Sequence, residues 1–221
     1  MKKKSFLKHL IILLIFFFIT LPFSVSQSHP HMSITTSIKF LWNGQKLKGA
    51  LFTWTFDAYF SAEIIRTWDF NEDGKFDKEE TNNVYNKAFL NLENYHYFIF
   101  IRIGDKRINP KKTSNFSVTQ KNRYMTYQFF IDLSHLKSSD FYISVYDYTY
   151  FCDVRYTKKN PVTFSYNPYK VKAYYKIQEN EKYPVYYNPL GAIDDTRVYY
   201  KWKPGLNTYY PREIHIRYVK K

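Results

Sequence analysis

Residues Asp69 to Glu80 read DFNEDGKFDKEE, the spacing of oxygen ligands found in an EF-hand calcium loop. The ligand positions 1, 3, 5, 9 and 12 are filled by Asp69, Asn71, Asp73, Asp77 and Glu80. Gly74 at position 6 permits the sharp turn, and Lys75 at position 7 offers its backbone carbonyl. Because Ca²⁺ prefers such oxygen ligands, the segment predicts one structural calcium site.

Apolar residues on both sides of this loop recur at helical spacing. They are Phe60, Ile64, Ile65 and Trp68 before the loop, and Val84, Tyr85, Ala88, Phe89 and Leu92 after it. These stripes predict a helix–loop–helix insertion over residues 57–94, with Asp57 as the N-cap of its first helix. A surface loop rich in Asp and Asn is the alternative interpretation.

The start of the chain has the pattern of a secretory signal peptide. Lysines 2, 3, 4 and 8 precede an apolar run, LIILLIFFFITL at 10–21, and small residues follow Pro22. A helix of that run is about 18 Å long, short of a hydrocarbon core of about 30 Å. We therefore expect residues 1–28 to be removed, with cleavage after Ser28 or, alternatively, after Ser26; an uncleaved anchor is the other interpretation. A cleaved signal peptide implies that the protein is exported to the periplasm or beyond.

The remaining composition fits one exported domain, residues 29–221. The formal charge of +14 falls to about +10 without the first 28 residues, which hold four lysines and no acid. This charge forms no compact run, which argues against nucleic-acid binding but leaves contact with an anionic membrane surface open. Cys152 is the single cysteine, so no internal disulfide forms, and its strand-like surroundings predict a buried, inert thiol.

Alternating apolar residues predict a mainly β fold, a single β-sandwich-like domain with the helical EF-hand insertion packed against one end. Asn43-Gly44 predicts a hairpin turn between the first two strands. The strands are expected at 32–42, 48–56, 95–103, 115–119, 124–133, 141–146 and 149–156. A Tyr- and Lys-rich C-terminal part, 161–221, adds strands at 163–166, 171–177, 197–202 and 213–219.

Several short motifs occur in an order that resembles the DUF1007 family of exported bacterial proteins. They are His29-Pro30-His31, Trp54-Thr55-Phe56-Asp57 with Phe60-Ser61, the calcium loop, Asn91-Leu92 with Tyr95-His96-Tyr97-Phe98, and Tyr146-Asp147-Tyr148-Thr149-Tyr150-Phe151. The resemblance covers residues 29–156. It implies a periplasmic component of a transport system associated with membrane permeases for nickel, cobalt or zinc. Tyr148 stands where members usually carry proline, which leaves that corner less rigid.

His29 and His31 are the candidate ligands for a transition metal, because imidazole is a common ligand of zinc, nickel and copper. Pro30 has no backbone N–H, so it cannot supply the deprotonated amide of a square-planar amino-terminal motif. Two imidazoles are unlikely to complete a four-coordinate shell by themselves, so a group from the folded domain is needed. The candidates for that group are His96, Asp57, Asp147 and Asp153, each with a structural role as the alternative.

No ordered set of nucleophile, base and acid stands out, and no glycine-rich phosphate loop exists, so we expect no enzyme activity. The sequence predicts an exported accessory protein of a nickel, cobalt or zinc transport system, with Ca²⁺ bound as a structural element. Its partner would be a membrane permease. One alternative is a calcium-stabilised extracytoplasmic binding or adhesion module in which the histidines have no role. A copper enzyme using an N-terminal His29 is another.

Overall fold

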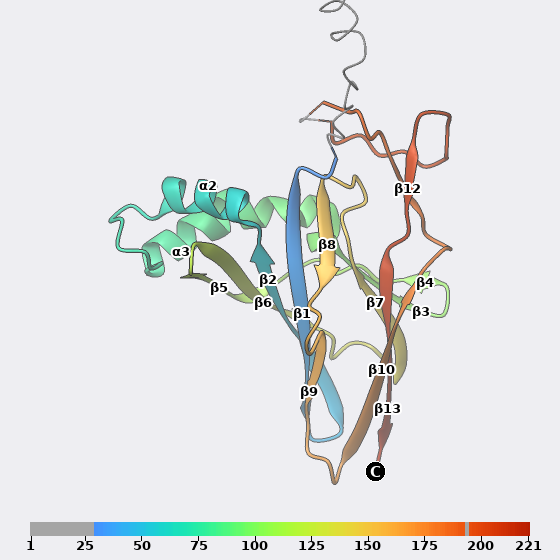
Figure 1. Ribbon diagram of the computed structural model, residues 1–221. Coiled ribbons are helices and arrows are strands. Elements are labelled where there is room, and N and C mark those ends of the chain that lie inside the picture. The colour runs from blue at the N-terminus through green and yellow to red at the C-terminus, as the bar shows by residue number, and fades with distance from the viewer. Residues whose placement is uncertain (1–28, 193–194) are drawn as a thin grey trace, which may run out of the picture.

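The computed structural model describes residues 29–192 and 195–221 (Figure 1). The predicted signal peptide, residues 1–28, lies outside these described residues. Within them, no helix combines the length and the apolar character needed to cross a membrane.

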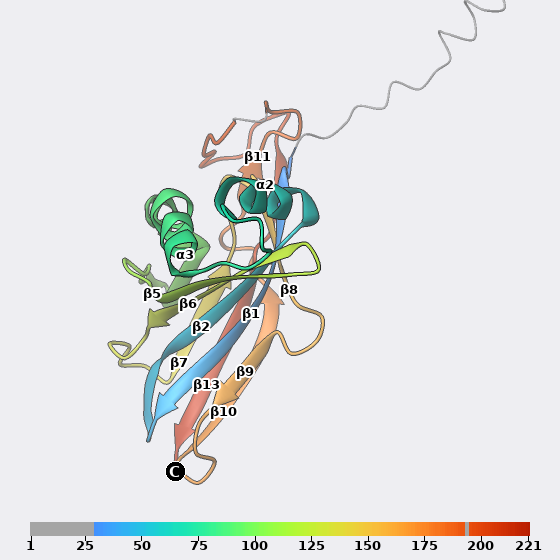
Figure 2. The same cartoon turned by 90° about the vertical axis from the view of Figure 1, so that its left-hand side faces the viewer.

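The larger of two main sheets follows the order β5-β6-β2-β1-β8, and β9 also pairs with β1 (Figure 2). Its strands are β1 (Met32–Asn43), β2 (Lys46–Phe56), β5 (Ser114–Lys121), β6 (Tyr124–Asp132), β8 (Cys152–Tyr156) and β9 (Val162–Ser165). The strand β1 pairs antiparallel with β2 and parallel with both β8 and β9. The turn between β1 and β2 uses Gly44 at φ 60°, as the Asn43-Gly44 pair predicted.

The second sheet follows the order β10-β13-β7-β3-β4, and all its pairings are antiparallel. Its strands are β3 (Ile99–Ile103), β4 (Lys106–Arg107), β7 (Asp140–Val145), β10 (Val171–Glu179) and β13 (Arg212–Lys220). A small third sheet pairs β11 (Val185–Tyr187) with β12 (Asn207–Tyr209). The C-terminal part of the chain therefore contributes strands to all three sheets.

One face of the larger sheet carries the core. Along β2, alternate residues are buried because a strand points successive side chains to opposite faces. These buried residues are Ala50, Phe52, Trp54 and Phe56. The second sheet covers this face beside β1, where the rings of Phe40 and Phe141 lie 6.0 Å apart. The two sheets and the helical segment share a single cluster of buried residues.

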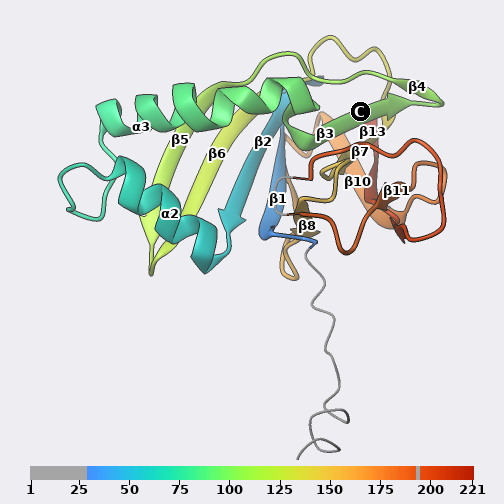
Figure 3. The same cartoon turned by 90° about the horizontal axis from the view of Figure 1, so that it is seen from above.

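The helical segment covers the same face farther along, beside β2 and β6 (Figure 3). It consists of α2 (Ala58–Trp68), α3 (Lys78–Val84), a π-helical turn (Tyr85–Phe89) and a 3₁₀ segment (Leu90–Phe98). The Phe89 ring packs 4.8 Å from that of Phe129. The hydroxyl of Ser61 accepts a 2.9 Å hydrogen bond from the backbone N–H of Met125. These contacts fix the helices on the sheet.

The mainly β fold and most of the predicted strands are confirmed. The insertion, however, lies across a face of the larger sheet and not only against one end. The strand predicted at 95–103 begins only at Ile99, because His96 and Tyr97 adopt left-handed backbone with φ near 54° and 52°. The strand predicted at 197–202 is wrong: Tyr199 makes only an isolated bridge to Tyr186, and the residues beside it do not continue the pairing.

Asp57 connects α2 to the start of β1, as its predicted capping role requires. Its Oδ1 accepts a 2.9 Å hydrogen bond from the backbone N–H of Phe60, and its Oδ2 accepts one of 2.6 Å from the N–H of Ser33. Replacing the carboxylate removes a helix cap and leaves the Ser33 N–H without its acceptor. We expect Asp57→Ala to lower the free energy of unfolding by about 1–3 kcal/mol, measured by urea denaturation.

The matched control is Glu63→Ala, which removes an exposed carboxylate paired with Arg66 on the outer face of α2. This control should change the unfolding midpoint little, because exposed ion pairs contribute little to stability. Equal midpoints for Asp57→Ala and the control would contradict the capping role.

Candidate functional site

The imidazoles of His29 and His31 pack against each other at the start of β1. Their ring centroids lie 4.6 Å apart at an interplanar angle of 67°. His29 is buried, with 3% of its surface exposed, and His31 is half-buried. The Nδ1 atom of His29 and the Nε2 atom of His31 are buried without a hydrogen-bond partner. Each ring thus has one buried nitrogen that makes no hydrogen bond to the described protein.

Parallel pairing with β8 holds these residues in place. The backbone N–H of His31 donates a 2.9 Å hydrogen bond to the carbonyl of Phe151, and the His31 ring lies 5.0 Å from the Phe151 ring. Cys152, the next residue, opens β8 opposite Met32. The thiol of Cys152 is buried, as predicted.

A loop from the C-terminal part of the chain closes the other side of His29. A Cβ atom added at Gly191 would lie 2.9 Å from His29 Nε2 and 2.8 Å from Asp195 Oδ2. These separations are shorter than real Cβ contacts, so only glycine at 191 allows the imidazole and the carboxylate to come this close to the backbone. Asp195 was not considered in the sequence analysis, and it is the carboxylate that adjoins the histidines.

Asp195 is also held by Arg197. The Nε and a terminal nitrogen of Arg197 donate hydrogen bonds of 2.7 and 2.6 Å to the two carboxylate oxygens. This two-pronged contact lowers the pKa of Asp195 to about 2. The carboxylate is therefore ionised at any physiological pH.

Burial lowers the pKa of the His31 imidazole from its ordinary value, and the neighbouring His29 ring lowers it further. A hydrogen bond with the backbone of Ala192 opposes this effect. The lowered pKa keeps His31 neutral at pH 7, and neutral imidazole is the form that ligates a metal.

The segment Asp69–Glu80 forms the loop between α2 and α3, and its side chains organise its backbone. Asp69 Oδ2 accepts a hydrogen bond from the N–H of Gly74, which has φ 73°. Asn71 accepts one from the N–H of Asp73, and Asp73 in turn accepts one from the N–H of Lys75. The oxygens at positions 1, 3 and 5 are thus oriented by the loop's own amides.

Glu80 closes this loop from the start of α3. It forms a reciprocal capping box with Asp77 and also accepts a 2.8 Å hydrogen bond from the N–H of Phe70. Glu80 is 2% exposed and Asp69 7% exposed, and Oδ1 of Asp69 is buried with no partner. None of the ion pairs formed among the described residues involves either carboxylate. Buried carboxylates without a counter-charge are costly, so a cation suits this position.

In residues 29–192 and 195–221, no three His, Cys, Asp or Glu side chains gather closely enough to hold a metal ion. The third ligands suggested by sequence have other contacts. Asp57 caps α2, and Asp153 pairs with Arg155. Asp147 accepts hydrogen bonds from Thr149 and Cys152 within its own turn. The His96 ring packs edge-on to Phe100.

Comparison with known proteins identifies the family. The group described as "Protein of unknown function (DUF1007)" matches residues 14–218, nearly the whole chain. This chain belongs to the DUF1007 family. It is 31% identical over 101 residues to an "Uncharacterized 15.5 kDa protein in trpE 3'region" of Spirochaeta aurantia, spanning 45% of this chain and 72% of that protein.

A second relative is an "Uncharacterized protein" of Haemophilus influenzae, strain ATCC 51907 / DSM 11121 / KW20 / Rd. It is 28% identical over 145 residues, which span 62% of this chain and 68% of the relative. The family match extends into β13, so it includes most of the C-terminal part, which lies beyond the motifs of the sequence analysis.

The contact between Asp195 and Arg197 predicts an unusual acid titration. In wild type the Asp195 carboxyl should titrate near pH 2, and in Arg197→Met its pKa should rise toward the ordinary value of about 3.9. Because the folded-state pKa is lowered, the associated stability is fully present above pH 3.9 and is lost as pH falls toward 2. Carboxyl ¹³C NMR measures both titrations. Identical Asp195 titrations in the two proteins would contradict the two-pronged contact.

Proposed function

We propose that this DUF1007 protein is an exported accessory protein that binds a transition metal ion through His29 and His31 and delivers it to a membrane permease. The proposal rests mainly on the packed pair of imidazoles, each with a buried nitrogen that has no hydrogen-bond partner among the described residues. Such nitrogens lose their hydration without compensation unless they receive a proton donor or a metal ion.

The donor set suits Zn²⁺, Ni²⁺ or Co²⁺. Imidazole nitrogens bind these ions readily, and the lowered pKa of His31 removes competition from a proton at pH 7. A carboxylate is a common additional ligand of zinc. Asp195 is the candidate for this ligand, since its Oδ2 and His29 Nε2 both approach Gly191 and its charge interacts with His29.

The guanidinium of Arg197 opposes ligation by Asp195, because it occupies a lone pair on each carboxylate oxygen and places a positive charge beside the metal. Because no three ligating side chains are already gathered among the residues that the structure describes, we propose that metal binding draws Asp195 from Arg197 toward the imidazoles. Such a weakly assembled site suits a protein that must release its ion to a partner. If export removes residues 1–28, the new α-amine of His29 becomes a fourth candidate ligand.

Two further arguments support the transport role. The lysine-rich head and the short apolar run at the start of the chain have the pattern of a cleaved signal, which would put the histidines in the extracytoplasmic space. We infer the permease as a partner because the motifs resemble those of proteins associated with nickel, cobalt and zinc permeases. Mass spectrometry of the intact exported protein tests the cleavage, and a mass beginning at His29 is expected.

The metal site is tested by calorimetric titration of the exported protein with Zn²⁺, Ni²⁺ and Co²⁺. We expect one ion to bind at pH 7.5, with affinity falling at acidic pH below about 6.5, because protons compete for imidazole and the pKa of His31 lies below that ordinary value. The variant His29→Ala/His31→Ala should lose this binding. Asp195→Asn should weaken it by about 10-fold or more while leaving the protein folded.

The matched control is His135→Ala, which removes an exposed imidazole far along the sequence and should bind the metal as wild type does. Titration curves that are the same for wild type and the double variant would remove the support for a transport role. The alternative, an extracytoplasmic binding module stabilised by calcium alone, would then be the better account.

We also propose that Asp69–Glu80 forms an EF-hand-type site that holds Ca²⁺ as a structural element. The proposal is supported by the buried, unpartnered Oδ1 of Asp69 and by the hydrogen bonds that orient the loop. The two hydrogen bonds accepted by Glu80 leave further lone pairs on its two oxygens for a cation. The remaining ligands would be Asn71, Asp73, Asp77 and the carbonyl of Lys75. Calcium would have to draw these groups together, because no three carboxylates among the described residues already lie close enough to hold an ion.

Calcium should therefore stabilise the fold. At about 100 times the dissociation constant, bound Ca²⁺ adds about 2.7 kcal/mol to the free energy of unfolding. We expect Glu80→Gln to abolish the rise in melting temperature that calcium gives wild type. Glu79→Gln, which changes the same charge at an exposed neighbouring position, should retain the rise. Calorimetric melting in calcium and in chelator makes the comparison, and a wild type that melts identically in both would rule the site out.

A further inference from the structure

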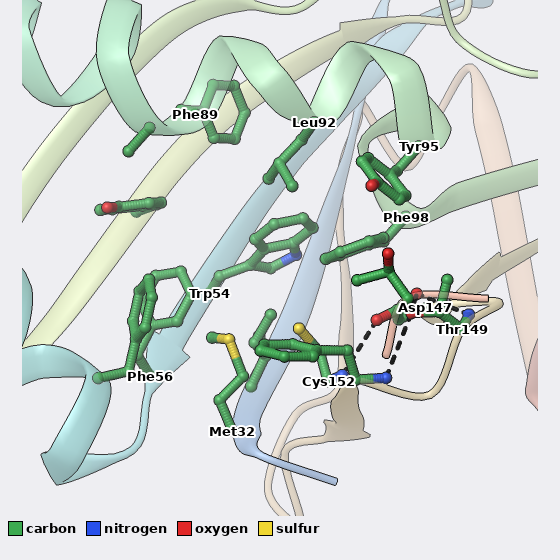
Figure 4. A pocket seen from close by; sticks show the side chains of 16 residues that line it. Met32, Trp54, Phe56, Phe89, Leu92, Tyr95, Phe98, Asp147, Thr149 and Cys152 are labelled. Carbon is green, nitrogen blue, oxygen red and sulfur yellow. Dashed lines mark hydrogen bonds between the residues drawn. The ribbon is translucent and has the colours of Figure 1, made fainter. Parts of the chain in front are cut away.

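A cavity of about 240 Å³ lies between the larger sheet, the helical segment and the turn that precedes β8 (Figure 4). Aromatic and aliphatic side chains form most of its wall: Trp54 and Phe56 come from β2, Phe89 and Leu92 from the helical segment, and Phe98 from the end of the 3₁₀ segment. An apolar cavity of about 150 Å³ can hold benzene, so this one has room for a larger molecule.

The wall also presents hydrogen-bond donors that lack acceptors. Trp54 is fully buried, and its Nε1–H has no partner. In Figure 4 the indole nitrogen lies on the edge of the ring that is turned toward Phe98 and Asp147. The hydroxyl of Tyr127, which also lines the cavity, is buried without a partner. Buried Trp and Tyr normally find acceptors, and an indole N–H can only donate.

The charges around the cavity restrict the ligand further. No Lys, Arg or His is among the described residues that line it, so an anion would have no counter-charge. Among the described residues of the wall, Asp147 is the only acidic one, and its oxygens already accept hydrogen bonds from Thr149 and Cys152 (Figure 4). The carboxylate therefore serves its own turn and is poorly suited to hold a cation. A neutral ligand fits best.

We propose that this cavity binds a neutral, mainly apolar small molecule whose single hydrogen-bond acceptor, a carbonyl or ether oxygen, lies against the Nε1–H of Trp54. The bound molecule would fill the space between the sheet and the helical segment. It would give an acceptor to the Nε1–H of Trp54, one of the two buried donors of the wall that have no partner among the described residues. This site is separate from the imidazole pair, although Met32 and Thr196, the neighbours of His31 and Asp195, line it.

The proposal is tested with three probes of nearly the same shape: 2-acetylnaphthalene, 2-ethylnaphthalene and 2-naphthoate. The ketone supplies a neutral acceptor, the hydrocarbon none, and the acid a charge. We expect calorimetry to show binding of the first two and none of 2-naphthoate at pH 7.5. In wild-type protein the indole N–H resonance of Trp54 should move farther downfield with the ketone than with the hydrocarbon, because a hydrogen bond adds to the ring-current shift that both naphthalenes cause.

Variants locate the site. Trp54→Phe should lower the ratio of ketone affinity to hydrocarbon affinity by about 5-fold, the change in affinity expected when one hydrogen bond is lost. Trp42→Phe is the matched control, because its indole N–H also lacks a partner but lies outside the cavity wall, and it should keep the wild-type ratio. Ala88→Leu, which adds bulk at the wall, should weaken both probes.

Failure of wild-type protein to bind either neutral probe would overturn the proposal. A Trp54 resonance that responds equally to the ketone and the hydrocarbon would overturn the role of the indole. The wild-type resonance gives this answer even if Trp54→Phe does not fold. Because none of these measurements uses a metal, their outcome is independent of the proposed transport function.

Discussion

The pairing of β1 with β2, β8 and β9 is the constraint on which the rest of the structure depends. Antiparallel pairing with β2 builds the face that carries the core, and parallel pairing with β8 and β9 returns later parts of the chain to the same strand. The pairing with β8 also fixes the residues just before β1. His31 is hydrogen-bonded to Phe151 at the end of this ladder, so the imidazole pair is held by the sheet and not by a free tail.

The C-terminal part of the chain then completes both the fold and the candidate site. Strands β10 and β13 extend the second sheet, and β13 pairs directly with β7. Between these two strands the chain passes the histidines, where Gly191 permits the close approach of Asp195. The three features proposed to bind ligands, namely the imidazole pair, the Asp69–Glu80 loop and the apolar cavity, are all supported by the larger sheet and the elements on its core face.

Features set by local spacing could be predicted from the sequence, whereas features that depend on distant parts of the chain could not. The alternation in β1 and β2, the Asn43-Gly44 turn and the Asp57 cap all follow from a few neighbouring residues. The departures from prediction at His96 and Tyr97 come from left-handed backbone that no nearby glycine signals. The closeness of Asp195 to His29 depends on a contact between the two ends of the domain, and the glycine at 191 is its only sequence signal.

The same contrast separates the two candidate ion sites. The loop Asp69–Glu80 contains all its proposed ligands in twelve residues, so the proposal of a calcium site there follows mainly from the spacing in the sequence. The transition-metal site needs one ligand from a separate segment, and its assignment depends on the fold. Cavities are still harder to foresee, because the unpaired donor of Trp54 results from the way three elements meet around it.

The central claim is that the imidazole pair binds a transition metal. Its most direct test is X-ray absorption spectroscopy of the exported protein, loaded with one equivalent of Zn²⁺. The extended fine structure counts imidazole ligands through their characteristic multiple scattering. The account predicts two imidazoles and additional oxygen or nitrogen ligands at about 2.0–2.2 Å, with no sulfur. A spectrum with one imidazole or none, or with a sulfur ligand, would contradict it.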